Sequence, residues 1–106
     1  MQKMIFVSLP VTDLNASIAF YKALNFEQNL HLSDENSAGM MWSEAIHVML
    51  LTHAKWRTLT PRPLPPAGTS ASMLSLTMES RDAVDAMNLA AAAHGGRADV
   101  NPVEDL

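Results

Sequence analysis

Four histidines are the side chains in this sequence best suited to bind a metal ion or to move a proton near neutral pH. They are His31, His47, His53 and His94, and no two stand four residues apart, the spacing that places two ligands on one face of a helix. His47 lies inside an apolar run, so we expect it to contact a hydrogen-bond partner or a ligand in the interior. Metal binding or proton transfer is the alternative role for His47. His94 is expected to cap the end of a helix.

Other side chains with catalytic potential give little support for a reaction. The adjacent carboxylates at 34–35 and 104–105 fall in a turn and in the tail, where solvated side chains are usual. Ser8 and Ser75 have no evident base beside them, so a nucleophilic role is unsupported. The absence of cysteine excludes disulfides, thiolate metal sites and cysteine nucleophiles. The sequence therefore predicts no catalytic residue.

Length and composition indicate one globular domain. The chain has 106 residues, 48% of them hydrophobic, which is enough apolar surface to offset the entropy of a folded chain. The net charge is -4 and no basic run is present, so nucleic acid and anionic membranes are poor partners. No apolar run approaches the roughly 20 residues of a membrane-spanning helix. Because the first residues do not resemble a signal peptide, we expect a cytoplasmic protein.

Hydrophobic periodicity predicts a strand and a helix, followed by three strands. Residues 4–11 alternate as a strand does, and residues 14–24 follow helical spacing after Asp13, a residue suited to the N-cap. Asn25 tolerates the left-handed conformation that ends many helices. The three following strands are predicted at residues 27–32, 40–42 and 46–52. Their short turns indicate an antiparallel meander.

The second half of the chain repeats the opening pattern at an offset of 67 residues. Between the halves, residues 54–70 hold four prolines and are expected to form a loop. A strand is predicted at 74–78, followed by a helix from the N-cap Ser80 to about His94 and the start of another strand at 97–100. We therefore expect a single domain over 1–106. It comprises module one (1–53), a proline-rich connector (54–70) and a partial module two (71–106).

The run LPVTDLNASIAFYKALNF at 9–26 resembles the opening signature of the glyoxalase / bleomycin-resistance / extradiol dioxygenase superfamily, also called vicinal oxygen chelate, with Asn25 where glycine is usual. The strand at 46–52 and the helix start at 80–81 are similar to the subfamily of predicted lactoylglutathione lyases. This resemblance implies an α+β fold of paired βαβββ modules that form an open antiparallel half-barrel. The given sequence stops at Leu106, before the family's last two strands. We therefore expect either a longer chain or an incomplete second module, and a homodimer that covers the exposed edge.

The resemblance also implies where a metal ion would bind. It places ligands at Phe6, at Met73 and near 49–51, with a further ligand on a strand beyond the given sequence. Phenylalanine, methionine and leucine side chains do not coordinate a hard or borderline cation well. We therefore expect no metal, no cofactor and no catalytic residue in this chain.

A cavity wall remains as the candidate site. Eight methionines suit an adaptable apolar surface, and Trp42 and Trp56 are candidate stacking platforms. We interpret the chain as a metal-free protein that binds an apolar or aromatic small molecule in this cavity. Alternatively, the side chains of the cavity wall simply fill a core. A metal-dependent lactoylglutathione-lyase-like isomerase or dioxygenase, completed by missing residues or by a partner subunit, is the alternative function. A ferredoxin-like βαββαβ dimer would need two strands between its helices, whereas three are predicted. The predicted lining residues are Phe6, Ser8, Met41, Trp42, His47, Met49, Met73, Ser75 and Thr77.

Overall fold

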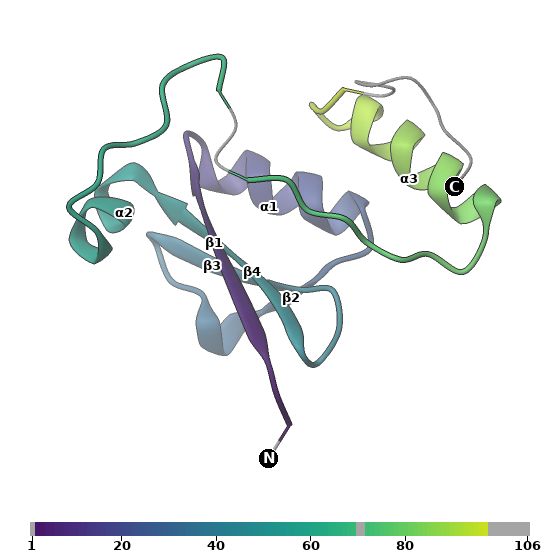
Figure 1. The fold of residues 1–106 in the computed structure, drawn as a ribbon, viewed down its shortest axis with the longest axis horizontal. Helices are drawn as coiled ribbons and strands as arrows, with labels where there is room; N and C mark the ends of the chain where they lie inside the picture. Colours follow the sequence, from purple (N-terminus) through teal and green to yellow (C-terminus); the bar gives the residue numbers. More distant parts are fainter. Residues whose placement is uncertain (1, 70–71, 98–106) are drawn as a thin grey trace.

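A computed structural model describes residues 2–69 and 72–97 of the chain. In Figure 1 the strands lie in the middle of the molecule, and α2 and α3 lie at opposite ends of it. The elements, in chain order, are β1 (Ile5–Val11), α1 (Leu14–Ala23), β2 (Glu27–Asn29), the 3-10 helix η1 (Leu30–Leu32), β3 (Ser37–Met41), β4 (Ile46–Thr52), α2 (His53–Leu59) and α3 (Arg81–Ala93).

The strands form one mixed sheet in the order β1-β4-β3-β2. Strand β4 runs parallel to its neighbour β1. The pairs β2/β3 and β3/β4 are antiparallel, which confirms the predicted meander. The described chain thus has an α+β fold whose first half is a βαβββ module. Among the described strands β1 pairs with β4 alone, so its other edge has no neighbouring strand.

Helix α1 begins at the predicted residue and ends at Ala23, one residue before the predicted end. The Asp13 side chain accepts a hydrogen bond of 3.1 Å from the amide of Ala16, which satisfies one of the free donors of the first turn. At the other end Asn25 has a φ of 68°, the left-handed conformation that asparagine tolerates best after glycine. Between these two ends, α1 packs across one face of the sheet, against β3 and β4.

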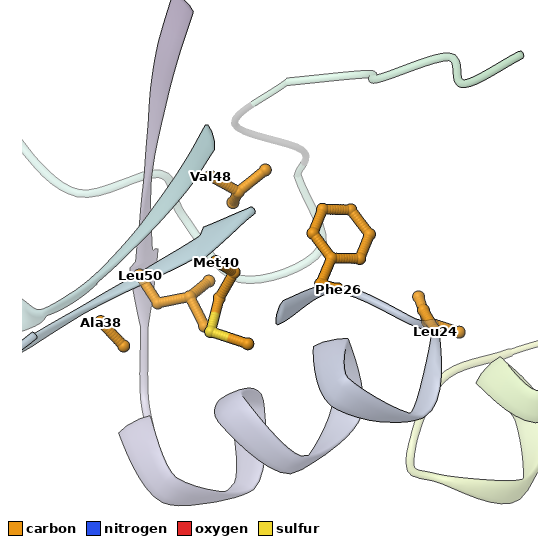
Figure 2. Close-up of a cluster of buried hydrophobic side chains, with 6 residues drawn as sticks. All are labelled: Leu24, Phe26, Ala38, Met40, Val48 and Leu50. Carbon is orange, nitrogen blue, oxygen red and sulfur yellow. The ribbon is translucent and has the colours of Figure 1, made fainter. Parts of the chain in front are cut away.

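The core lies between that face and α1. Alternate residues of β3 and β4 point toward the helix, and of these Met40 and Leu50 are fully buried. Tyr21 of α1 meets Phe26 edge-on at 5.1 Å, and burial raises the pKa of its phenol, which stays protonated at neutral pH. Figure 2 shows the cluster, formed by Leu24, Phe26, Ala38, Met40, Val48 and Leu50.

The strand predicted over 27–32 is correct only to Asn29. The Asn29 side chain accepts a hydrogen bond of 3.0 Å from the amide of His31, and this contact turns the backbone into η1. Ser33 then donates to the carbonyl of Asn29 at 2.8 Å and accepts from the amide of Gly39 at 3.2 Å. The short polar side chains of Asn29 and Ser33 therefore end β2 early and fold η1 back over β3.

Strand β3 begins three residues before the predicted start at 40. Asp34 accepts hydrogen bonds from the amide of Asn36, at 2.7 Å, and from the hydroxyl of Ser37, at 3.0 Å. These bonds hold the pKa of the Asp34 carboxyl below its usual value, because they favour the charged form. The tight turn that they close brings Ser37 into the sheet opposite Leu51, which extends the strand.

Part of the predicted connector is helical, which corrects the expectation of a loop over 54–70. Helix α2 starts directly after β4, where the Thr52 side chain accepts a hydrogen bond of 3.2 Å from the amide of Lys55. It stops before Pro61, since the residue that precedes a proline is driven out of the helical conformation. The connector's proline-rich part begins only at this point.

The strand predicted at 74–78 is also wrong, because residues 72–78 belong to no strand. Leu76 packs against the core cluster, while Met73 is 91% exposed. The alternation is present in the sequence, but a strand forms only where a partner offers free backbone groups. The strand expected at 97–100 lies outside the described residues, apart from Arg97.

Helix α3 confirms the predicted helix of the second half. The Ser80 side chain accepts a hydrogen bond of 3.1 Å from the amide of Ala83 at its start. At its end His94 is the cap, with Nδ1 2.8 Å from the carbonyl oxygen of Ala90. With 13 residues, α3 is the longest helix of the described parts, in which no helix is long and apolar enough to cross a membrane.

Candidate functional site

Five predicted lining residues lie on the sheet face that points away from α1, here called the open face. In β1, Phe6 and Ser8 pair with His47 and Met49 of β4, and Met41 of β3 also pairs with His47. Residues paired in this way point to the same side of a sheet. The period of two that was seen in the sequence therefore brings these side chains together.

His47 is the polar centre of the open face. Its ring is stacked on Phe6, with centroids 4.6 Å apart and an interplanar angle of 20°. Nε2 lies 3.0 Å from the carbonyl oxygen of Glu44, so Nε2 carries a hydrogen and donates it. In this tautomer Nδ1 is an acceptor, and it is buried with no hydrogen-bond partner among the described residues. Only 2% of the His47 residue is exposed.

The groups around His47 are mostly apolar, and some remain accessible. Phe6 is 48% exposed, Ser8 is exposed and Met49 is half-buried. Such a surface offers an aromatic ring and a thioether for van der Waals contact and one hydroxyl to orient a bound molecule, with the free ring nitrogen of His47 buried beneath Phe6. The arrangement can bind a small apolar compound, but it contains no paired acid and base.

Two further residues share the open face, although they were not among the predicted lining residues. Gly39 pairs with Met49, and Leu51 pairs with Ser37. Leu51 follows Met49 at the same period of two, so the alternation already contained the signal that places it here. Gly39 has no side chain, and Leu32 of η1 lies against the position where a Cβ would stand.

Trp42 is the first residue after β3, and its side chain does not share the open face. Its ring lies 5.2 Å from that of Phe26 and packs against the core cluster. Thr77 lies near Trp42, since both residues line one cavity. Two residues predicted for one wall are therefore brought together on the α1 side of the sheet.

The remaining candidates lie apart from this face. Met73 and Ser75 are exposed residues of the segment 72–78, and Met73 does not occupy a strand position equivalent to Phe6. Trp56, a candidate stacking platform, lies in α2, where its indole nitrogen is buried without a hydrogen-bond partner in the described chain.

The side chains present do not fit the metal site that the resemblance implies. Phe6 and Met49 occupy positions on the open face where donors would be needed, and neither is a suitable ligand. Across residues 2–69 and 72–97, no three histidine or carboxylate side chains gather closely enough to hold a metal ion. We therefore derive no metal-dependent step for this site.

Comparison with solved structures supports the architecture. A hypothetical protein from S. aureus superposes with a TM-score of 0.72 at 23% identity, over 90% of this chain and 71% of that one. A glyoxalase/bleomycin resistance protein/dioxygenase family enzyme from Burkholderia phytofirmans PsJN superposes with a TM-score of 0.64 at 17% identity, over 89% of this chain and 74% of that one. No protein-family model matches the sequence, and no curated protein does. The chain thus shares its fold with an enzyme of the glyoxalase/bleomycin resistance/dioxygenase family.

Proposed function

We propose that this chain is a metal-free member of the glyoxalase/bleomycin-resistance superfamily that binds a small aromatic molecule on its open face. The observation that carries the proposal is the buried and unpartnered Nδ1 of His47, stacked beneath an accessible phenylalanine. The shared fold and the opening signature at 9–26 support the family assignment.

The unpartnered nitrogen has a thermodynamic consequence. A buried acceptor without a hydrogen bond costs about 1–3 kcal/mol, so a ligand that donates to it recovers part of that cost. The stacked Phe6 ring supplies the apolar part of the contact. We therefore propose a ligand with a flat apolar body and one hydrogen-bond donor.

Sequestration without chemistry is the activity that we propose. The lactoylglutathione-lyase-like and dioxygenase alternatives need a donor set around a metal ion, and Phe6 and Met49 offer none where the family resemblance places it. No contact among the described residues favours these alternatives over simple binding.

A matched pair of probes tests the ligand class. We expect 2-naphthol to bind saturably and to shift the NMR signals of Phe6, His47 and Met49. 2-Methoxynaphthalene, which has no hydroxyl donor, should bind about fivefold more weakly, which is the loss of one ordinary hydrogen bond. Nuclear magnetic resonance titration of both compounds into the full chain measures this ratio.

Two alanine variants complete that experiment. Phe6→Ala removes the stacked ring and is expected to weaken 2-naphthol binding about fivefold, within the range for an aromatic contact. Leu89→Ala, an equal kind of truncation at a residue that is 68% exposed in α3, should leave binding unchanged. Equal affinity for the two probes, or the absence of saturable shifts at Phe6 and His47, would overturn the proposal.

We also propose that a second copy of the chain covers the free edge of β1. Within the described parts of the chain no strand pairs with that edge, and Met4, Ile5 and Phe6 beside it are 46%, 56% and 48% exposed. An edge strand can pair with its own copy about a twofold axis. Sedimentation velocity at micromolar concentration is expected to show a dimer. A stable monomer under those conditions would contradict this part of the proposal but not the ligand site.

A further inference from the structure

A second candidate site lies on the α1 side of the sheet, and we call it the Trp42 cavity. Its volume is about 450 Å³, within the range of small-molecule sites. It lies where the turn after α1, the end of β3 and the start of α3 meet. The lining residues are Asn25, Trp42, Thr77, Met78, Glu79 and Ala83.

The indole of Trp42 is a fixed wall of this cavity. The ring is tilted by 46° against Phe26, itself only 6% exposed, and the backbone amide of Trp42 donates to the carbonyl of Ile46 at 3.0 Å. Trp42 is nevertheless only half-buried, so it is accessible from the cavity. An aromatic wall held in this way loses little side-chain entropy when a ligand stacks on it.

The polar lining is acidic. Glu79 is the one charged residue among the six that line the cavity, and the amide of Asn25 and the hydroxyl of Thr77 are neutral. An indole face attracts cations through its quadrupole, and a carboxylate at the same cavity adds to that attraction. An anion would meet repulsion from Glu79 and from the electron-rich ring face.

From this combination we propose that the Trp42 cavity binds a small organic cation of the substituted-ammonium class. Met78 and Ala83 offer apolar contacts for the alkyl groups of such a cation, while Trp42 and Glu79 line the same cavity and attract its charge. The site is separate from the open face, because Trp42 lies on the opposite side of the sheet from Met41. It therefore does not depend on the function proposed above.

Choline and its neutral isostere, 3,3-dimethyl-1-butanol, test the charge requirement. In a Trp56→Phe background, Trp42 is the sole indole and its fluorescence reports on the cavity. We expect choline to change that fluorescence saturably and to bind about tenfold more tightly than the isostere, in line with a partly desolvated cation–π contact. Added salt should weaken choline binding and leave the isostere unaffected.

Variants that each remove one carboxylate charge test whether Glu79 causes the preference for choline. Glu79→Gln is expected to weaken choline binding about fivefold and to leave isostere binding unchanged, because Glu79 is exposed and its replacement keeps the shape. Glu35→Gln, at an exposed turn residue that does not line the cavity, is the matched control and should change neither affinity.

Equal binding of choline and the isostere, an unchanged choline affinity in Glu79→Gln, or no saturable response to choline would each overturn the proposal. A negative result with choline does not bear on the 2-naphthol proposal, because the 2-naphthol experiment monitors Phe6 and His47.

Discussion

Replacement of Leu50 by alanine is expected to lower the free energy of unfolding by about 3 kcal/mol, within the range for buried leucines. Leu50 has no exposed surface and lies in β4, one of the two inner strands, paired with Leu9 on one side and Ala38 on the other. Its side chain packs into the cluster beneath α1 (Figure 2). Because strands on both sides are hydrogen-bonded to β4, the cavity left by truncation cannot close by a simple shift of the backbone.

Urea unfolding followed by far-ultraviolet circular dichroism measures this loss. The control is Leu89→Ala in α3, where the leucine is 68% exposed and its truncation should change stability by less than about 0.5 kcal/mol. Similar losses for the two variants would show that burial at Leu50 is not what stabilises the sheet.

Replacement of Gly39 by alanine is expected to cost about 1–3 kcal/mol, the usual range for overpacking. A Cβ at Gly39 would lie 2.8 Å from the Cβ of Leu32 and 3.4 Å from its carbonyl oxygen. The first contact joins two atoms close to the backbone, so a change of rotamer cannot relieve it. Either η1 must lift from β3 or the strand must bend.

A double-mutant cycle isolates the clash. Leu32→Gly removes the opposing Cβ, so the cost of Gly39→Ala should fall by at least half in that background, with stability again measured in urea. An equal cost in both backgrounds would mean that the β-strand backbone, and not the close approach of η1, requires glycine at this position.

The first half of the fold could be predicted from local signals. Asp13 and Asn25 mark the two ends of α1. The Asp13 side chain bonds a free amide of the first turn, and Asn25 adopts a left-handed conformation that few residues favour. The alternation in β1 and β4 predicted that Phe6, Ser8, His47 and Met49 share one face of the sheet. This local signal is sufficient because a period of two is a property of the strand itself.

The errors arise where tertiary contacts decide the outcome. Residues 74–78 alternate as clearly as β1 does, yet they form no strand. The sequence of a single segment does not indicate whether a strand edge will lie beside it in the folded protein. The placement of Thr77 beside Trp42 likewise depends on the path of the chain after α2. Trp42 was predicted to line the same wall as Met41, but it lies just beyond the end of β3 and packs against Phe26 and the core cluster.

The position of β4 also determines when the molecule can fold during synthesis. Ile5 pairs with Ile46, which is translated 41 positions later, so β1 has no partner until then. At about 5–20 residues per second, that wait lasts roughly two to eight seconds. Before β4 emerges from the ribosome, only β2 and β3 can pair, and the apolar residues Leu9 and Val11 remain uncovered. This interval is when nascent copies are most prone to aggregate and when a chaperone would have its greatest effect.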